Sequence, residues 1–233
     1  EALSYNNPKG LLQLRKDIVR EETPMFFAII YLILVTVLIL IAMFEPDKKH
    51  YIPCKMLCSA LFVIIGLLHS LSLAIIGFCF CFAGDLFMGL YNRYRKKKYM
   101  GLGMLLFLLA HVVFLIYLFA LYPDFSYIQA VLPLLLCLLG LVLINSFHLH
   151  LGRLRYAVLV YSVFVSAFMV KAVSIMLTSG SLRIGYAGIL FWLSDFSLLF
   201  YYFYHFRNKS IEKAVQGFNL GTYYAAMLLL ALG

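Results

Sequence analysis

The chain has 233 residues, of which 64% are hydrophobic, 17% aromatic and only 12% charged. A soluble domain carries about 25% charged residues because its surface faces water, so this composition, with a mean hydropathy of +0.96, excludes a soluble protein. The formal net charge of +9 would suggest a nucleic-acid partner in a soluble domain. In a membrane protein it is typical of basic loops at an anionic leaflet. We therefore expect an integral, multi-pass membrane protein of the all-α class that binds no nucleic acid.

Residues 1–24 have a different composition from the rest of the chain. Leu11, Leu14 and Ile18 recur at helical spacing among charged residues, which predicts a short amphipathic helix lying in the membrane interface. Pro24 then marks the expected start of the first span. The predicted organisation is an interfacial segment over 1–24 and a transmembrane domain over 25–233.

Eight apolar stretches are long enough to cross a bilayer, whose core of about 30 Å requires about 20 apolar residues in a helix. They run approximately over residues 25–44, 53–68, 70–91, 100–121, 127–147, 156–178, 184–206 and 214–232. The weakest boundary is His69-Ser70, but without it residues 53–91 would form one implausibly long helix. We therefore expect a bundle of about eight transmembrane helices.

Basic residues are concentrated in alternate loops. The loops after the first, third, fifth and seventh spans hold twelve Lys and Arg residues, against five in the leading segment and the remaining loops. The positive-inside rule then predicts both termini on the non-cytoplasmic side, although four basic residues of the leading segment do not fit this orientation. The expected location is the cytoplasmic membrane in a bacterium or an endomembrane in a eukaryote.

Only two of the ten acidic residues, Asp85 and Asp195, fall inside the expected spans. A charge at mid-bilayer costs about 2.5–3.5 kcal/mol even on the lenient insertion scale, so such residues usually face the bundle interior. Either they hold helices together by hydrogen bonds or they form a reactive or ion-binding site. Both are followed by aromatic residues and a basic cluster, four spans apart, which suggests two parallel four-helix repeats.

Other polar residues lie in the same half of the membrane, measured from the basic face. They are Lys55, His111, Asn145, Tyr223 and Tyr224. This pattern predicts a pocket that opens to the cytoplasmic leaflet. Two carboxyls in one such pocket do not ionise together easily, so one acts as an acid and the other as a base.

The same two aspartates would equally serve as a proton relay in a proton-coupled transporter or channel. A lipid-binding protein without turnover is a third interpretation. No metal or cofactor site is expected, because His148-x-His150 lacks a third ligand and the cysteines lack zinc-like spacing. Lys171 falls nearer the opposite face of the membrane, where its ammonium can snorkel to water.

Several short motifs occur in order along the spans: Lys55, Gly84-Asp85, Ala110-His111, Leu190-Phe191-Trp192-Leu193-Ser194-Asp195 and Tyr223-Tyr224. With these motifs the chain resembles the lysoplasmalogenase-like (YhhN-type) family of eight-span integral membrane hydrolases. The chain departs from the family pattern at Phe114, where a Tyr is common, and at Met227, where a Gln is common.

The resemblance implies hydrolysis of the vinyl ether bond of a lysoplasmalogen, a lysophospholipid substrate drawn from the bilayer. The products would be a fatty aldehyde and glycerophospho-choline or -ethanolamine. It implies that Asp85 and Asp195 are the catalytic acid and base and that no cofactor is needed. The residues implied to bind substrate or position water are Lys55, His111, Ser194, Tyr223 and Tyr224.

Overall fold

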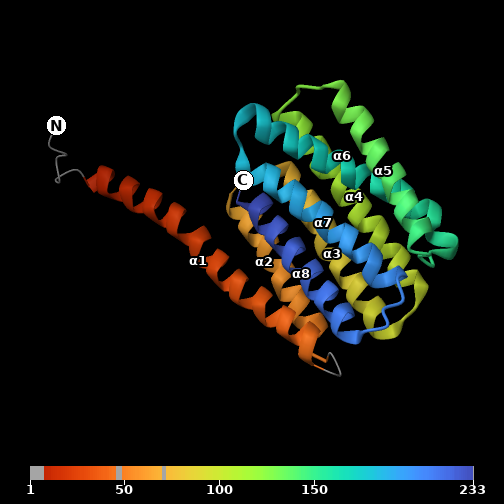
Figure 1. Ribbon diagram of the computed structural model, residues 1–233. Coiled ribbons are helices and arrows are strands. Elements are labelled where there is room, and N and C mark those ends of the chain that lie inside the picture. The colour runs from red at the N-terminus through yellow and green to blue at the C-terminus, as the bar shows by residue number, and fades with distance from the viewer. Residues whose placement is uncertain (1–7, 46–48, 70–71, 233) are drawn as a thin grey trace.

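The computed structural model describes residues 8–45, 49–69 and 72–232, which form eight α-helices and one short 3-10 helix, with no strand in these ranges (Figure 1). The elements are α1 (Pro8–Phe44), α2 (Tyr51–Leu68), α3 (Ser72–Tyr94), α4 (Lys97–Leu121), α5 (Tyr127–Ser146), η1 (Gly152–Leu154), α6 (Arg155–Ser179), α7 (Leu182–Phe203) and α8 (Lys209–Ala231). The prediction of an all-α membrane bundle is confirmed. The predicted break between the second and third spans is also confirmed, since α2 ends at Leu68 and α3 begins at Ser72.

Seven of the eight helices are long and apolar enough to cross a membrane, counted over the described residues. The exception is α8, which the sequence had suggested as the eighth span. Its buried residues include Gln216, Asn219, Tyr223 and Tyr224, so it is less apolar than the other helices although it lies inside the bundle. It packs against α7, α1 and α2.

The first helix is longer than the span predicted for it. It runs unbroken from Pro8 through Pro24 to Phe44, and the part of it that is long and apolar enough to cross a membrane, Phe26–Phe44, agrees with the predicted span over residues 25–44. At about 1.5 Å per residue such a helix is roughly 55 Å long, well beyond a hydrocarbon core of about 30 Å. Its N-terminal part projects away from the bundle in Figure 1. The interfacial position of the leading segment stays a prediction, and residues 1–7 lie outside the described ones.

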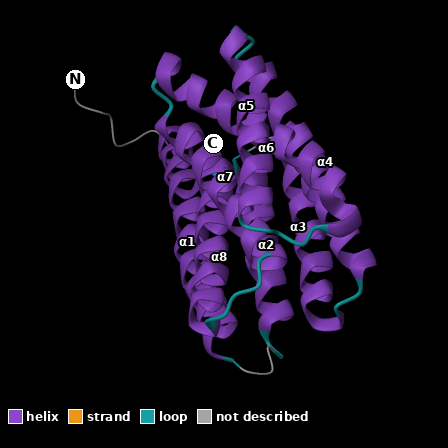
Figure 2. Ribbon diagram, turned by 45° about the vertical axis from the view of Figure 1, so that its right-hand side comes forward, coloured by secondary structure: helices purple, strands orange, loops and turns teal. Residues whose placement is uncertain are grey.

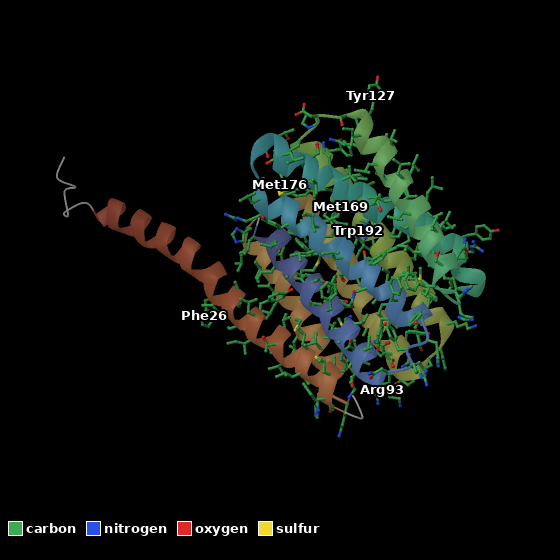
Figure 3. The ribbon with its side chains drawn as sticks, in the orientation of Figure 1. Phe26, Arg93, Tyr127, Met169, Met176 and Trp192 are labelled. Atoms are coloured by element: carbon green, nitrogen blue, oxygen red, sulfur yellow. The ribbon has the colours of Figure 1, made fainter. Side chains whose placement is uncertain are left out.

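Successive helices run up and down and are joined by short connections (Figure 2). The connections after α1, α3, α5 and α7 therefore share one end of the bundle. Arg93 marks this basic end in Figure 3 and Tyr127 the opposite end. Helix α5 is peripheral, with only Gln129, Pro133 and Ile144 buried along its length.

Two glycines bring α7 close to α6. A Cβ added at Gly185 would lie 2.5 Å from the Met176 side chain, and one added at Gly188 would lie 2.5 Å from the Cβ of Ala172. Small residues let helix backbones approach in this way in membranes. The two methionines labelled on α6 in Figure 3, Met169 and Met176, both line this contact.

Aromatic side chains fill the centre of the bundle. Phe114 is 1% exposed and its ring packs against Phe78, Phe168 and Phe191. A tyrosine at this position, as in the family pattern, would need a partner for its hydroxyl, whereas phenylalanine suits a fully apolar neighbourhood. The difference from the family pattern at Phe114 therefore concerns apolar packing in the centre of the bundle.

Candidate active site

Asp85 lies on α3, about nine residues before the helix ends at the basic face, and it is 1% exposed. Three donors from two other helices surround its carboxylate. Lys55 Nζ of α2 lies 2.9 Å from Oδ1, while Ser59 Oγ and Tyr223 OH donate to Oδ2 over 2.6 and 2.9 Å. An ammonium and two hydroxyl donors are the partners that an ionised carboxylate accepts.

A second layer of hydrogen bonds fixes these donors. Lys55 and Ser59 lie one turn apart and therefore share a face of α2. Tyr224 OH donates to the Lys55 carbonyl over 3.3 Å and lies 3.1 Å from Ser59 Oγ. Tyr31 of α1 in turn donates to the Tyr224 carbonyl over 2.7 Å. The Asp85 site is thus built by α2, α3 and α8 and supported by α1.

Asp195 lies on α7 with different partners. Tyr161 OH of α6 donates to its Oδ2 over 3.0 Å, and His111 Nε2 of α4 lies 3.3 Å from the same oxygen. His111 Nδ1 lies 2.8 Å from the Phe107 carbonyl, which can only accept, so Nδ1 carries a proton. Nε2 makes no hydrogen bond to any described residue, so it lies beside the Asp195 carboxyl group as an uncommitted ring nitrogen.

The imidazole of His111 is fully buried among aromatic rings. The ring centroids of Phe191, Tyr161 and Phe168 lie 4.3, 5.5 and 5.8 Å from its own. This enclosure excludes water from the rear of Asp195. Nε2 of His111 can therefore act only through the carboxyl group of Asp195.

Both aspartates line one polar cavity of about 30 Å³ near the basic end of the bundle. One water needs roughly 10–15 Å³ of such volume, so the cavity has room for about two waters. The other polar side chains in its wall are Tyr51, Lys55, Asn92, Ser194, Tyr201, Tyr202, Gln216, Asn219 and Tyr223. The structure thus joins two carboxyl groups that lie 110 residues apart in the chain.

The residues that the sequence suggested for substrate binding fall into two groups. Lys55, Ser194 and Tyr223 line the polar cavity. His111 and Tyr224 stand behind it as partners of the lining groups. Lys55 is engaged with Asp85, and Ser194 accepts from Asn219 Nδ2 at both its hydroxyl and its carbonyl, over 2.9 and 2.8 Å.

Asn145 does not join the site. It is exposed and accepts a hydrogen bond of 3.1 Å from Arg155. Lys171 lies towards the opposite end, as expected, but it is buried instead of reaching water. Its ammonium donates to the Asp124 carbonyl over 2.6 Å and lies 4.1 Å from the Phe119 ring centroid. Lys171 therefore stabilises the connection between α4 and α5.

Eight polar residues of the site were not predicted from the sequence: Ser59, Tyr161, Gln216 and Asn219, and the wall residues Tyr51, Asn92, Tyr201 and Tyr202. The sequence could have indicated Ser59, because it lies one turn from Lys55. It could also have indicated Gln216 and Asn219, since they share a face of α8 with Tyr223. Nothing in the sequence distinguishes Tyr161, because tyrosines are common throughout this chain.

The described residues contain no group of three or more His, Cys, Asp or Glu side chains placed to hold a metal ion. The site offers two carboxyls, the Lys55 ammonium, one buried imidazole and the tyrosine and serine hydroxyls for chemistry. They can donate, accept and relay protons and orient water.

Comparison with known proteins connects this site to a family. The model of the YhhN family matches residues 51–233, which include every helix that contributes to the two carboxylate sites apart from α1. Neither the curated proteins nor the solved structures gave a match to the chain. With the match covering well over half of its length, the chain belongs to the YhhN family.

Proposed function

We propose that this protein is a lysoplasmalogenase-like hydrolase that cleaves the vinyl ether bond of single-chain alkenyl phospholipids. The observation that carries the proposal is the position of the aspartates. Both line the polar cavity, and Asp195 also lines a larger apolar cavity next to it. In an alkenyl lysolipid the vinyl ether joins the hydrocarbon chain to the polar glycerol. A substrate that spans the two cavities would therefore place this bond at Asp195.

The reaction needs a proton donor and a group that handles a cation. A proton adds to the alkenyl carbon farther from oxygen and leaves an oxocarbenium ion on the adjacent carbon. Water attacks that carbon, loses a proton and gives a hemiacetal, which breaks its bond to the glycerol oxygen. The products are an aldehyde and an alcohol, and the protons taken up and released balance.

We assign the proton donor to Asp195 and the cation-stabilising carboxylate to Asp85. In this assignment His111 would exchange the delivered proton with Asp195 through Nε2, because Nδ1 of the imidazole is already committed to the Phe107 carbonyl. Asp85, beside Lys55, is supplied with donors that favour its ionised form. It would stabilise the oxocarbenium ion and accept the proton of the attacking water.

The phosphate of the substrate would stay outside the polar cavity. The ammonium of Lys55 is neutralised by Asp85 at 2.9 Å, so it does not offer an uncompensated charge to an anion. The exposed segment Arg93–Lys98 at the same end of the bundle carries five basic residues. We therefore place the phosphate at this basic end rather than on Lys55.

The test is aldehyde release by the purified protein from an alkenyl lysophospholipid in D₂O. The expected aldehyde carries one deuterium on the carbon next to the carbonyl, because that carbon receives the solvent proton. The alkyl ether and acyl analogues should give no aldehyde. Cleavage of the acyl analogue alone would leave an intramembrane hydrolase and refute the vinyl ether assignment.

Variants test the two carboxyls. Asp195→Asn should lower the rate at least about a hundredfold, the usual contribution of general acid catalysis. Asp124→Asn is the matched control, because Asp124 is exposed in the connection after α4 and should leave the rate unchanged. Full aldehyde release by both Asp195→Asn and Asp85→Asn would refute the mechanism. Proton flux into liposomes without aldehyde would instead support a transporter.

A further inference from the structure

A second cavity lies between α4, α5, α6 and α7, beside the polar one. Its volume is about 170 Å³ and its wall consists almost entirely of carbon. The side chains that give it this character include Met104, Leu136, Leu139, Leu143, Val158 and Leu199. A cavity of this kind is filled by an apolar ligand more readily than by water.

The Trp192 and Ser162 donors in this wall are already engaged. The Trp192 indole N–H donates to Ser166 Oγ over 3.1 Å, and the Ser162 hydroxyl donates to the Leu159 carbonyl over 2.8 Å. These donors are therefore used within the protein. What the cavity offers to a ligand is apolar contact area.

The apolar cavity continues into the polar one. The two share Met88, Phe107, Asp195, Leu198 and Tyr202 in their walls. A ligand that occupies both must be apolar at one end and polar at the other, with the change at Asp195.

The apolar cavity also reaches the outer surface of the bundle. Leu139 of α5 belongs to its wall and is 51% exposed. The neighbouring α5 side chains Leu135, Leu138 and Val142 are 54%, 56% and 58% exposed, and in a membrane they face lipid chains. The opening beside α5 therefore leads into the hydrocarbon region of the bilayer.

We propose that the apolar cavity binds the hydrocarbon chain of a single-chain amphiphile, which enters laterally from the bilayer beside α5. The assignment rests on the proposed function only in placing the scissile bond at Asp195. Chain binding itself requires no turnover, so the two proposals can fail separately.

Gly140 gives a way to fill the cavity without distorting the helix. It lies in the cavity wall, and a Cβ added there meets nothing within 4 Å. Gly140→Leu should therefore occupy space meant for the chain. Gly101 of α4 also has nothing within 4 Å of an added Cβ but lies outside the wall, so Gly101→Leu is the matched control.

Trp192, which is labelled in Figure 3, reports on occupancy, because it is the one tryptophan of the chain and lines the cavity. The probe is a lysophosphatidylcholine with a dibrominated stearoyl chain, added to the protein in unbrominated detergent. Its acyl ester is not a vinyl ether, and bromine quenches indole fluorescence on contact. We expect the quenching to be saturable. The apparent affinity for the probe should be at least fivefold lower in Gly140→Leu than in the parent protein, and in Gly101→Leu it should be within twofold of the parent value.

Equal, non-saturable quenching in all three proteins would overturn the proposal. Should Gly140→Leu not fold, Gly140→Ala and Gly140→Val should show graded weakening with the same probe, and an ungraded response would equally overturn it. Saturable quenching without any aldehyde release would retain the chain site and reject the proposed reaction. Aldehyde release that Gly140→Leu leaves unchanged for every chain length would reject the chain site alone.

Discussion

The ion pair between Lys55 and Asp85 makes the sharpest prediction about stability. Both side chains are buried, at 7% and 1% exposure, and their charged atoms lie 2.9 Å apart. Lys55→Met keeps most of the side-chain volume and removes the charge. Asp85 then retains the hydroxyls of Ser59 and Tyr223 but loses its cation.

The magnitude follows from comparing two effects. Losing one interhelical hydrogen bond in a membrane costs about 0.6 kcal/mol on average. Leaving a buried charge without its partner costs about 3–5 kcal/mol. We expect the second effect to dominate, so Lys55→Met should lower the free energy of unfolding by about 3 kcal/mol. The double variant Lys55→Met/Asp85→Asn should regain most of the loss, because neither charge remains.

The assay is reversible unfolding of the purified protein by titration with SDS, followed by far-ultraviolet circular dichroism. The four proteins of the double-mutant cycle give the coupling free energy directly. A loss below about 1 kcal/mol in Lys55→Met, together with additive effects in the double variant, would refute the pairing of a charged lysine with an ionised Asp85.

Three further predictions concern helix packing, His69 at the connection between α2 and α3, and the contact between α1 and α8. Gly188→Ala should lower the free energy of unfolding in the SDS titration by about 1–3 kcal/mol, since its Cβ would lie 2.5 Å from that of Ala172. Gly140→Ala should preserve or raise this free energy, because its Cβ meets nothing within 4 Å. Burial lowers the pKa of His69, so the unfolded chain protonates first, and stability should fall as the pH drops below about 6.5. His69→Gln should flatten that part of the stability profile, and an unchanged slope would contradict the assignment. Tyr31→Phe removes a buried interhelical hydrogen bond of 2.7 Å to the α8 backbone and should cost about 0.6 kcal/mol by thermal unfolding, and an unchanged stability would contradict a contribution from this bond.

The arrangement explains why a mostly apolar protein retains polar residues on its eighth helix. Gln216, Asn219, Tyr223 and Tyr224 are buried and face the neighbouring helices. In the hydrocarbon region, polar groups need partners inside the protein. Asn219 finds its partner in Ser194 of α7, and Tyr223 in Asp85 of α3. This helix therefore forms part of the site while contributing little to the hydropathy that marks a span.

Hydropathy along the chain was enough to predict the class of protein and most helix ends, because a helix that crosses lipid must be apolar over a fixed length. It also singled out Asp85 and Asp195, since an acid within a span is costly enough to stand out. Helix α8 was recognised from its length, although it is less apolar than the other seven. The continuation of α1 through Pro24 escaped prediction, because a proline permits a helix boundary without requiring one.

The residues that surround each carboxyl could be identified only from the packing of the helices. Ser59 and Tyr161 donate to Asp85 and Asp195 because α2 and α6 pack with the required rotation, which neither residue's place in the sequence specifies. The same packing places Asp195 at the junction of a polar and an apolar cavity. Hydropathy fixes where a residue lies along a helix, but contacts between helices depend on side-chain packing around the axis, which a periodic apolar sequence does not specify.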